Sequence, residues 1–271
     1  MMKLGVNSVL FSGFDFPTAA RQAARAGYDG IEVSAIKGMC EHLVLDNWRE
    51  QAEGIRRAAA DNGLNLLSME VSALEESRLL PAFEAAESLG IPVVNIGPGG
   101  ASKSAEDFDR QVGLMARMAR EAARRGVTLC VKAHVGACID DTPMTLKAMR
   151  AVTGPGFGID MDPSHIYRAG EDPADALRQV IGRVRHVHIR DCKGRGPGPG
   201  LPQYQACGRG DIDLAAYCGV MAEAGYDGPV CLEVIGAGQL DLAQVCMIAA
   251  ESCGYLNACL KALGIRRGGA K

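Results

Sequence analysis

Acidic and imidazole side chains stand where short aliphatic runs of this sequence end. Asp162 follows "GIDM", His188 lies within "RHVHIRD", and Glu233 follows "PVCL". Carboxylate oxygens and imidazole nitrogens bind Mn²⁺, Mg²⁺, Co²⁺ or Zn²⁺, and such a set leaves coordination positions open for substrate oxygens. A divalent ion held there would polarise a carbonyl group and acidify the adjacent C–H. A carboxylate that shuttles the proton would then give an enediolate.

A further segment, "VTLCVKAHVG" at 127–136, is a buried strand that ends in Lys132 and His134. An ammonium group at the mouth of an apolar strand needs a partner, because charges are rarely buried unpaired. Four of the five histidines (134, 165, 186 and 188) fall in this segment and the next two. We interpret this grouping as a functional site, with a structural hydrogen-bond network as the alternative.

Length and composition are those of an ordinary globular chain, with 271 residues, 48% hydrophobic and 23% charged. The formal net charge is −3 and no polybasic run occurs, so neither nucleic acid nor an anionic membrane is an expected partner. The apolar runs are too short to span a membrane, and the N-terminus does not resemble a signal peptide. The ten cysteines are scattered without a C-x-x-C. We therefore expect reduced cysteines and a cytoplasmic protein.

A weak internal repeat organises the chain. "RAGYDGIEVS" at 25–34 is echoed by "EAGYDGPVCLEV" at 223–234, with looser copies between them. Each copy has a glycine before an aliphatic run, and in most copies we expect that glycine to end a helix in the left-handed conformation. These glycines are Gly27, Gly63, Gly90, Gly126, Gly154 or Gly158, Gly182 and Gly225.

Together with the opening "KLGVNSV", these junctions predict eight strands that alternate with helices. This pattern is typical of a (β/α)₈ TIM barrel, here a single domain over residues 1–271. An open doubly wound sheet is the alternative, but the glycine-rich fingerprint after the first strand is missing.

Side chains in a barrel strand alternate between the interior and the surrounding helices. With the aliphatic residues assigned outward, every strand ends in at least one inward polar group, at the rim where barrel enzymes keep their chemistry. The inward set is Gly5, Asn7, Glu32, Ser34, Ser68, Glu70, Asn95, Cys130, Lys132, His134, Asp160, Asp162, His186, His188, Cys231 and Glu233. Arg190 follows His188 with the same parity and is a candidate for substrate contact.

The sequence resembles the xylose isomerase-like TIM barrel superfamily, which comprises sugar isomerases and epimerases related to endonuclease IV and to keto-inositol (inosose) dehydratases. The resemblance covers nearly the whole chain. It rests on "GIDMDPSHIYRAGEDP", "RHVHIRD", "GRGDID" at 208–213 and "LEVIG". It implies that Asp162, His188 and Glu233 are metal ligands. It also implies that His165 bonds the substrate or a metal-bound oxygen, and that Glu233 can shuttle a proton.

One position departs from the family pattern. The family supplies a glutamate from strand five, as both ligand and acid/base group, where this chain has Lys132. A protonated lysine cannot ligate a metal and repels one. Three resolutions are open. His134 takes the fourth ligand position, or three protein ligands plus water suffice with Lys132 as base or oxyanion partner, or the ammonium replaces part of the charge of a lost metal.

We expect a divalent metal-dependent isomerase or epimerase of a sugar or polyol, with Mn²⁺ as the foremost ion. Glu233, Lys132 and His134 are the expected catalytic residues. The expected substrate contacts are His165, Arg190, Asn7 and Glu70, although Glu70 is equally suited to a structural ion pair. A homo-oligomer is an expectation from family habit alone.

Two other classes of function stay open. One is a dehydratase or lyase acting on a keto-inositol or 3-keto-sugar, because only one of two family carboxylates is retained. The other is a degenerate barrel that binds a sugar without turnover. A DNA-repair endonuclease is disfavoured, because the net charge is negative and the early strands lack histidines.

The glycine- and proline-rich segment 191–211 is expected to be a loop over the site. Its basic residues Lys193, Arg195 and Arg209 could hold an anionic substrate group. We favour the simpler interpretation, that they only solvate the loop.

Overall fold

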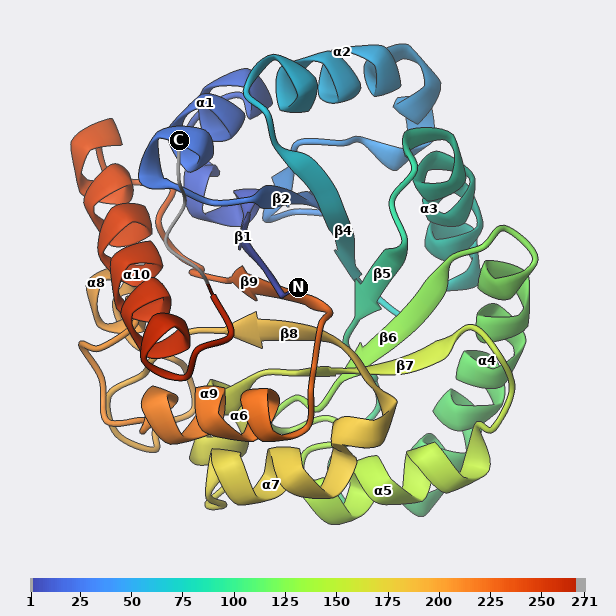
Figure 1. The fold of residues 1–271 in the computed structure, drawn as a ribbon. Coiled ribbons are helices and arrows are strands. Elements are labelled where there is room, and N and C mark those ends of the chain that lie inside the picture. Colours follow the sequence, from blue (N-terminus) through green and yellow to red (C-terminus); the bar gives the residue numbers. More distant parts are fainter. Residues whose placement is uncertain (1, 267–271) are drawn as a thin grey trace.

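The computed structural model describes residues 2–266. Eight parallel strands form one closed barrel, because β1 pairs with β2 on one side and with β9 on the other. This confirms the predicted TIM barrel (Figure 1). The barrel strands are β1 (Lys3–Asn7), β2 (Gly30–Ile36), β4 (Asn65–Ser72), β5 (Val93–Ile96), β6 (Thr128–Lys132), β7 (Phe157–Met161), β8 (Val184–Ile189) and β9 (Pro229–Leu232).

A short ninth strand, β3 (Cys40–Glu41), is not part of the barrel. It pairs antiparallel with the end of β2 through Ile36 and Cys40, and so extends β2 beyond the barrel rim. The sequence repeat did not predict it, because two residues are too few to show a strand pattern.

Helices surround the barrel and bury their apolar faces against the outer side of the strands (Figure 1). They are α1 (Phe16–Ala26), α2 (Trp48–Asp61), α3 (Glu76–Leu89), α4 (Ala105–Ala123), α5 (Thr142–Ala151), α6 (Pro163–Arg168), α7 (Pro173–Val180), α8 (Pro202–Gln205), α9 (Leu214–Glu223) and α10 (Leu242–Ala262). Short 3₁₀ turns cover Ser8–Phe11, Leu45–Asn47 and Ile181–Arg183. Several helices begin at an aspartate that accepts a backbone N–H, as Asp241 does in a capping box with Gln244.

The repeat glycines end their helices largely as the sequence predicts. Gly27, Gly63, Gly90, Gly126 and Gly225 all have positive φ. The predicted left-handed glycine was wrong at two places, between α5 and β7 and at Gly182. Gly156 carries the left-handed conformation there, with φ 77°, whereas Gly158 lies inside β7 and Gly182 lies in a 3₁₀ turn.

The barrel has an aliphatic outer layer and a largely polar interior. Leu4, Val6, Ile31, Val33 and Val94 are buried in the core cluster between strands and helices. Inward side chains of alternate parity are buried too, and they bond one another across the barrel, as Ser68 Oγ does with His186 Nε2 at 2.9 Å. The positional parity of the sequence therefore describes the buried inward side chains correctly, but not His134, which is exposed.

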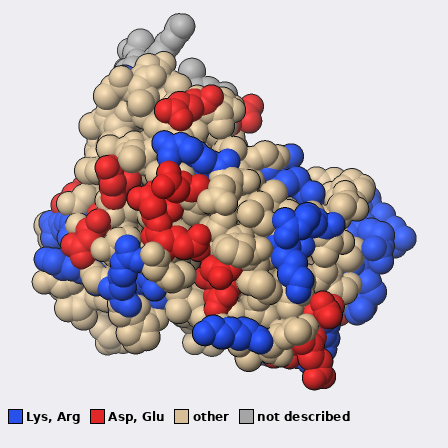
Figure 2. Space-filling model, turned by 90° about the horizontal axis from the view of Figure 1, so that it is seen from below, with Lys and Arg blue, Asp and Glu red and all other residues tan. Residues whose placement is uncertain are grey.

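The surface carries charges of both signs. On the face shown in Figure 2, acidic and basic groups both occur, without one continuous basic area on that face. None of the helices in residues 2–266 is long and apolar enough to cross a membrane.

Substitution of Gly30 tests how closely the neighbouring strands approach each other in the barrel. A Cβ at this position would lie 2.5 Å from the backbone oxygen of Asn65 and 2.5 Å from Leu67 Cγ. We expect Gly30→Ala to lower the free energy of unfolding by about 1–3 kcal/mol, since overpacking of this kind forces strands apart. Urea denaturation followed by circular dichroism measures it.

Gly54 provides the matched control. It lies in α2 with no atom within 4 Å of its added Cβ. Gly54→Ala should raise the free energy of unfolding by about 0.5–1 kcal/mol, because alanine favours the helix. Equal effects of the two substitutions would contradict the close approach at Gly30.

Candidate functional site

Lys132 lies at the centre of the rim residues. Its Nζ donates to both carboxylate oxygens of Glu233, at 3.0 and 2.9 Å, and to Glu70 Oε1 at 3.3 Å. The Nδ1 of His188 is 3.1 Å away. These partners come from β4, β8 and the residue after β9, so three widely separated segments converge on the end of β6. All four side chains are buried.

The two glutamates beside Lys132 have opposite pKa shifts. Burial and the nearby charge of Glu233 raise the pKa of Glu70 to about 8. Burial also favours neutral Glu233, but the charges of Lys132 and Arg190 outweigh it and hold its pKa well below the usual range. Near neutral pH the site thus contains one protonated and one ionised carboxyl group, a pattern found in acid/base pairs.

Asn7 fixes the orientation of Glu70. Its Nδ2 donates to Glu70 Oε2 at 2.6 Å, and its Oδ1 accepts the backbone N–H of Val9. Both residues lie at the rim, as predicted, and Asn7 contacts Glu70 rather than facing open space. The structure therefore shows a positioning contact for Asn7, while its predicted substrate contact is untested.

Asp162 and Arg190 form a second buried ion pair. Arg190 Nη2 lies 2.8 Å from Asp162 Oδ2, and Arg190 Nη1 lies 3.3 Å from Glu233 Oε2. Asp162 Oδ1 accepts both the backbone N–H and the hydroxyl of Ser164, at 2.8 and 2.7 Å. Arg190 Nη1 has no hydrogen bond of good geometry within residues 2–266, so one buried N–H is left for an acceptor.

His165 lies on α6, between two arginines. Its Nδ1 accepts from Arg168 Nη2 at 3.0 Å and from the backbone N–H of Val135 at 3.3 Å. Burial and the charge of Arg190 hold the pKa of His165 well below its usual range, so the ring is neutral. A neutral ring has one N–H, so only one of its two nitrogens can accept a hydrogen bond. The Nε2 of His165 lies 3.0 Å from Arg190 Nη2, a second guanidinium donor, and 3.8 Å from Asp162 Oδ2.

His188 is held by two carboxylates. Its Nε2 lies 2.6 Å from Glu32 Oε2 and its Nδ1 lies 2.6 Å from Asp160 Oδ2. Burial favours the neutral ring, but these two carboxylates outweigh it and raise the pKa of His188 well above its usual value. Both nitrogens of His188 are therefore engaged, which leaves no free lone pair for a metal.

His134 occupies a different environment. It follows the end of β6 and is exposed, and among the described residues its ring bonds only the backbone oxygen of Val135, at 3.2 Å. Its ring lies 4.1 Å from the His165 ring, centroid to centroid. The structure brings it to the edge of the site rather than among the buried carboxylates.

A cavity of about 540 Å³ opens over this cluster. Its apolar wall includes Ile36, Met39 and Ile235. Its polar lining consists of Glu70, Ser72, Lys132, His134, His165, Arg168, Arg190 and Glu233. Asp162 and His188 are not in the lining that the described residues form. A ligand in the cavity would therefore meet the ammonium, the guanidinium and the two glutamates first.

Three buried groups of side chains have donor atoms close enough to hold a metal: Glu32, His186 and Cys231; Asp160, His186 and His188; and Glu32, Glu70 and His188. In each group the donor atoms lie within 4.8 Å of one another, and they are of types that bind divalent metals. The structure thus contains buried clusters of His, Glu and Asp that are consistent with a metal site. The clusters do not determine which metal.

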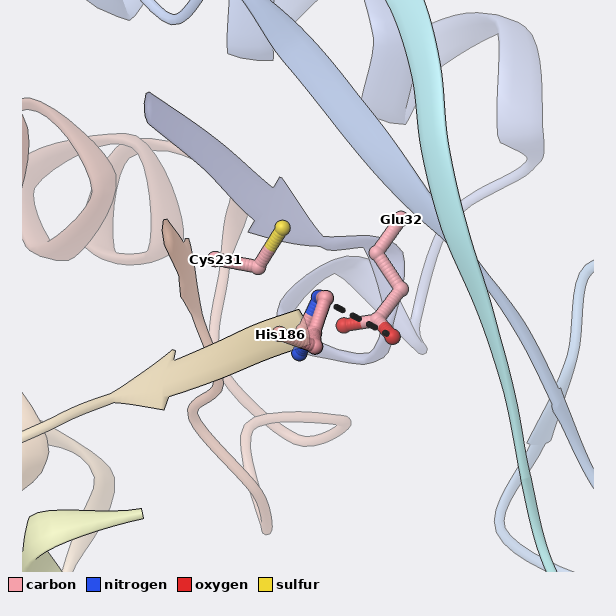
Figure 3. A group of neighbouring side chains, drawn as sticks. All are labelled: Glu32, His186 and Cys231. Atoms are coloured by element: carbon pink, nitrogen blue, oxygen red, sulfur yellow. Dashed lines mark ion pairs between the residues drawn. The ribbon is translucent and has the colours of Figure 1, made fainter. Parts of the chain in front are cut away.

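The first of these groups lies deep in the barrel, where side chains from β2, β8 and β9 point toward one another (Figure 3). His186 Nε2 is 3.8 Å from Glu32 Oε1 and also bonds Ser68 Oγ. Burial raises the pKa of the Cys231 thiol well above its usual value, which opposes the thiolate that a metal needs. This group serves the interior hydrogen-bond network.

The rim set expected from the sequence is not one of these close groups within residues 2–266. Asp162 is paired with Arg190, Glu233 with Lys132, and His188 with Glu32. A divalent ion about 4 Å from an ammonium is repelled by roughly 8 kcal/mol at an effective dielectric constant of about 20. The rim residues therefore do not fit a divalent metal while Lys132 and Arg190 stay where they are.

Sequence reasoning missed two kinds of functional residue. Arg168 lines the cavity and bonds His165, and its position three residues after that histidine on α6 was an available signal. Glu32 and Asp160 were predicted to point inward, but their ion pairs with His188 were not predicted from the sequence. Pairing across a barrel depends on strand register, which parity alone does not give.

Other sequence interpretations concern residues outside this cluster. All ten cysteines are free, as expected. In the loop after β8, Arg209 pairs with exposed Glu251 at 2.6 Å, while Arg195 lies over the Tyr167 ring and Lys193 over the Tyr204 ring. These contacts favour the interpretation that the loop cations are structural and solvating.

Comparison with known proteins gives a family match. Residues 20–257 match the family model described as xylose isomerase-like TIM barrel. Inosose dehydratase from Geobacillus thermodenitrificans is 22% identical over 226 residues, which cover 71% of this chain and 72% of that protein. L-ribulose-5-phosphate 3-epimerase from Salmonella paratyphi C is 22% identical over 240 residues, covering 79% of this chain and 80% of the epimerase.

Solved structures show the same barrel. D-allulose 3-epimerase from Methylomonas sp., solved in complex with D-allulose, has a TM-score of 0.73 and 19% sequence identity. The match covers 98% of this chain and 97% of the epimerase. Similar proteins are thus sugar epimerases and dehydratases, and at least one of them binds a sugar.

The raised pKa of Glu70 predicts a pH-dependent stability. Between the ordinary value of 4.5 and about 8, folded Glu70 keeps a proton that the unfolded chain releases. Its contribution to the free energy of unfolding therefore falls as the pH rises through this window. Relative to Glu70→Gln, the wild type should lose stability between about pH 5 and about pH 9, as measured by urea denaturation.

Glu223→Gln is the control, since Glu223 is exposed at the end of α9. The difference between this variant and the wild type should stay constant over the same pH range. A constant difference for Glu70→Gln as well would contradict the protonated state of Glu70.

Proposed function

Because this chain belongs to the xylose isomerase-like TIM barrel family, we propose that it is an enzyme that moves a proton on a carbon next to a carbonyl group. The substrate class is a small keto-sugar or polyol-derived ketone, and the reaction is isomerisation or epimerisation through an enediolate. One observation carries the proposal. Two buried carboxyl groups, Glu70 and Glu233, line the same cavity and share one ammonium, Lys132.

Glu233 and Glu70 have complementary roles in this proposal. Ionised Glu233 takes the proton from the carbon next to the carbonyl, and the electron pair moves onto the carbonyl oxygen. Protonated Glu70 returns a proton to the enediolate carbon. Proton return to the opposite face of the same carbon gives an epimer, and return to the neighbouring carbon gives an isomer.

Lys132 completes the cycle. After one turnover Glu233 is protonated and Glu70 is ionised, so a proton must pass back between them. Lys132 Nζ contacts both carboxylates, at 2.9 Å and 3.3 Å, and can accept a proton from one as it donates to the other. The ammonium therefore serves as both relay and charge balance.

Arg190 and His165 are the proposed donors to substrate oxygens. The Nη1 of Arg190 lacks a well-formed hydrogen bond within the described chain. Its N–H is therefore available to donate to the developing oxyanion. The neutral ring of His165 and the exposed ring of His134 both line the cavity and are suited to contact substrate hydroxyl groups. No step here needs a further cation.

A divalent ion among Asp162, His188, Glu233 and His134, with Mn²⁺ foremost, remains a prediction. When bound, such an ion would polarise the carbonyl group. It would require Lys132 and Arg190 to leave their present partners, Glu233 and Asp162.

A dehydratase or lyase is the second candidate. The observation that favours it is Glu70, a protonated carboxyl group in the cavity that could donate its proton to a departing hydroxyl. Proton removal by Glu233 followed by loss of water gives an unsaturated ketone. The similarity to inosose dehydratase is of the same order as the similarity to the epimerase, so similarity alone does not separate the two.

Proton exchange in D₂O is the direct test. A panel of ketopentoses, ketohexoses and inososes is incubated with the protein and followed by ¹H NMR. Loss of one C–H signal with a new stereoisomer indicates isomerisation or epimerisation, and an unsaturated product indicates dehydration. We expect Glu233→Gln to slow exchange by about 100-fold or more, since general base catalysis contributes that much.

Glu251→Gln is the matched control, because within residues 2–266 Glu251 pairs only with exposed Arg209 and lies outside the cavity lining. It should leave exchange unchanged. No exchange and no elimination with any substrate in the panel would contradict the proposed reaction class.

A further inference from the structure

We propose that the Lys132 ammonium occupies the cation position of this site, so that the chain works without a divalent metal. The inference rests on the proposed function for the identity of the site, but it can be tested without turnover. In this proposal Lys132 supplies the positive charge of the site, and it is held by carboxyl groups of the kind that ligate a metal.

The contacts of Lys132 resemble the coordination of an ion. Nζ lies within 3.3 Å of two oxygens of Glu233, one oxygen of Glu70 and one nitrogen of His188. The three carboxylate oxygens come from separate segments and are acceptors for the ammonium, whereas His188 Nδ1 is a close neighbour that also faces Asp160. Lys132 is only 4% exposed, so water replaces few of these contacts.

The charges at the rim already balance. Asp162 and Glu233 carry two negative charges, and Lys132 and Arg190 carry two positive charges in direct contact with them. Two univalent cations supply the charge that one divalent ion would bring. Adding such an ion would leave two buried positive charges in excess, which a protein interior does not tolerate.

The other predicted ligands also lie against charged or polar groups. His188 has carboxylates at both ring nitrogens, Glu32 on one side and Asp160 on the other. One oxygen of Asp162 accepts two hydrogen bonds from Ser164, and the other lies 2.8 Å from Arg190 Nη2 without a hydrogen bond of good geometry within residues 2–266. A metal could bind only after several buried hydrogen bonds and ion pairs had been broken together.

Metal content and metal binding test the inference. The full-length protein is purified, treated with EDTA and dialysed, then titrated with MnCl₂ by isothermal calorimetry and analysed by elemental mass spectrometry. We expect the wild type to bind no stoichiometric Mn²⁺ and to keep its C–H exchange activity in EDTA. Stoichiometric binding by the wild type would overturn the inference.

The variant Lys132→Glu replaces the ammonium with a carboxylate. We expect it to bind one Mn²⁺, with an affinity more than about 100-fold above any residual binding by the wild type. A second substitution, Asp162→Asn in the Lys132→Glu background, should weaken this binding again. A folded Lys132→Glu protein without Mn²⁺ binding would also overturn the inference.

Two further variants keep the test decisive. Lys37→Glu makes the same charge change at an exposed residue of the β2–β3 loop and should not create Mn²⁺ binding. If circular dichroism shows that Lys132→Glu does not fold, Lys132→Gln removes the cation with less disturbance and must gain measurable Mn²⁺ binding. Absence of C–H exchange both with and without added Mn²⁺ would count against the proposed function and not against this inference, whereas exchange that appears only with added Mn²⁺ would overturn the inference.

Discussion

The buried ammonium of Lys132 is the contact on which the arrangement of the site depends. Two glutamates from opposite parts of the barrel, Glu70 and Glu233, lie close together at the rim. Two carboxylates in that position would repel each other without a cation between them. The ammonium permits their approach, and the resulting asymmetry leaves Glu233 ionised and Glu70 protonated.

Buried charged side chains are also paired in the barrel interior below the rim. Asn95 donates to Glu32, Glu32 and Asp160 hold His188, and Asp160 also accepts from His186. Each of these buried charged side chains thus has a hydrogen-bond or ion-pair partner on another strand of the barrel. Buried charges are costly unless they are paired and hydrogen-bonded, so removal of one member would expose the others to that cost.

The sequence contained enough information for the barrel and for the location of the site. Seven glycine-marked junctions and the opening strand predicted eight strands, and parity predicted which side chains point inward. The partners of those side chains could not be predicted. The contact between Lys132 and Glu233 depends on strand register and on the length and conformation of both side chains. The alternation of side chains along one strand does not give either of these. His134 shows this limit, since parity places it inward but the chain leaves β6 after Lys132 and the ring is exposed.

Membership of the family fixes the architecture, but not which charged side chains meet at the rim. An anomalous difference map at the manganese absorption edge, from crystals grown with Mn²⁺, tests the central claim most directly. The account predicts Lys132 Nζ between Glu70 and Glu233, with no anomalous peak among Asp162, His188 and Glu233. A strong peak there, with the Lys132 side chain turned away, would contradict it.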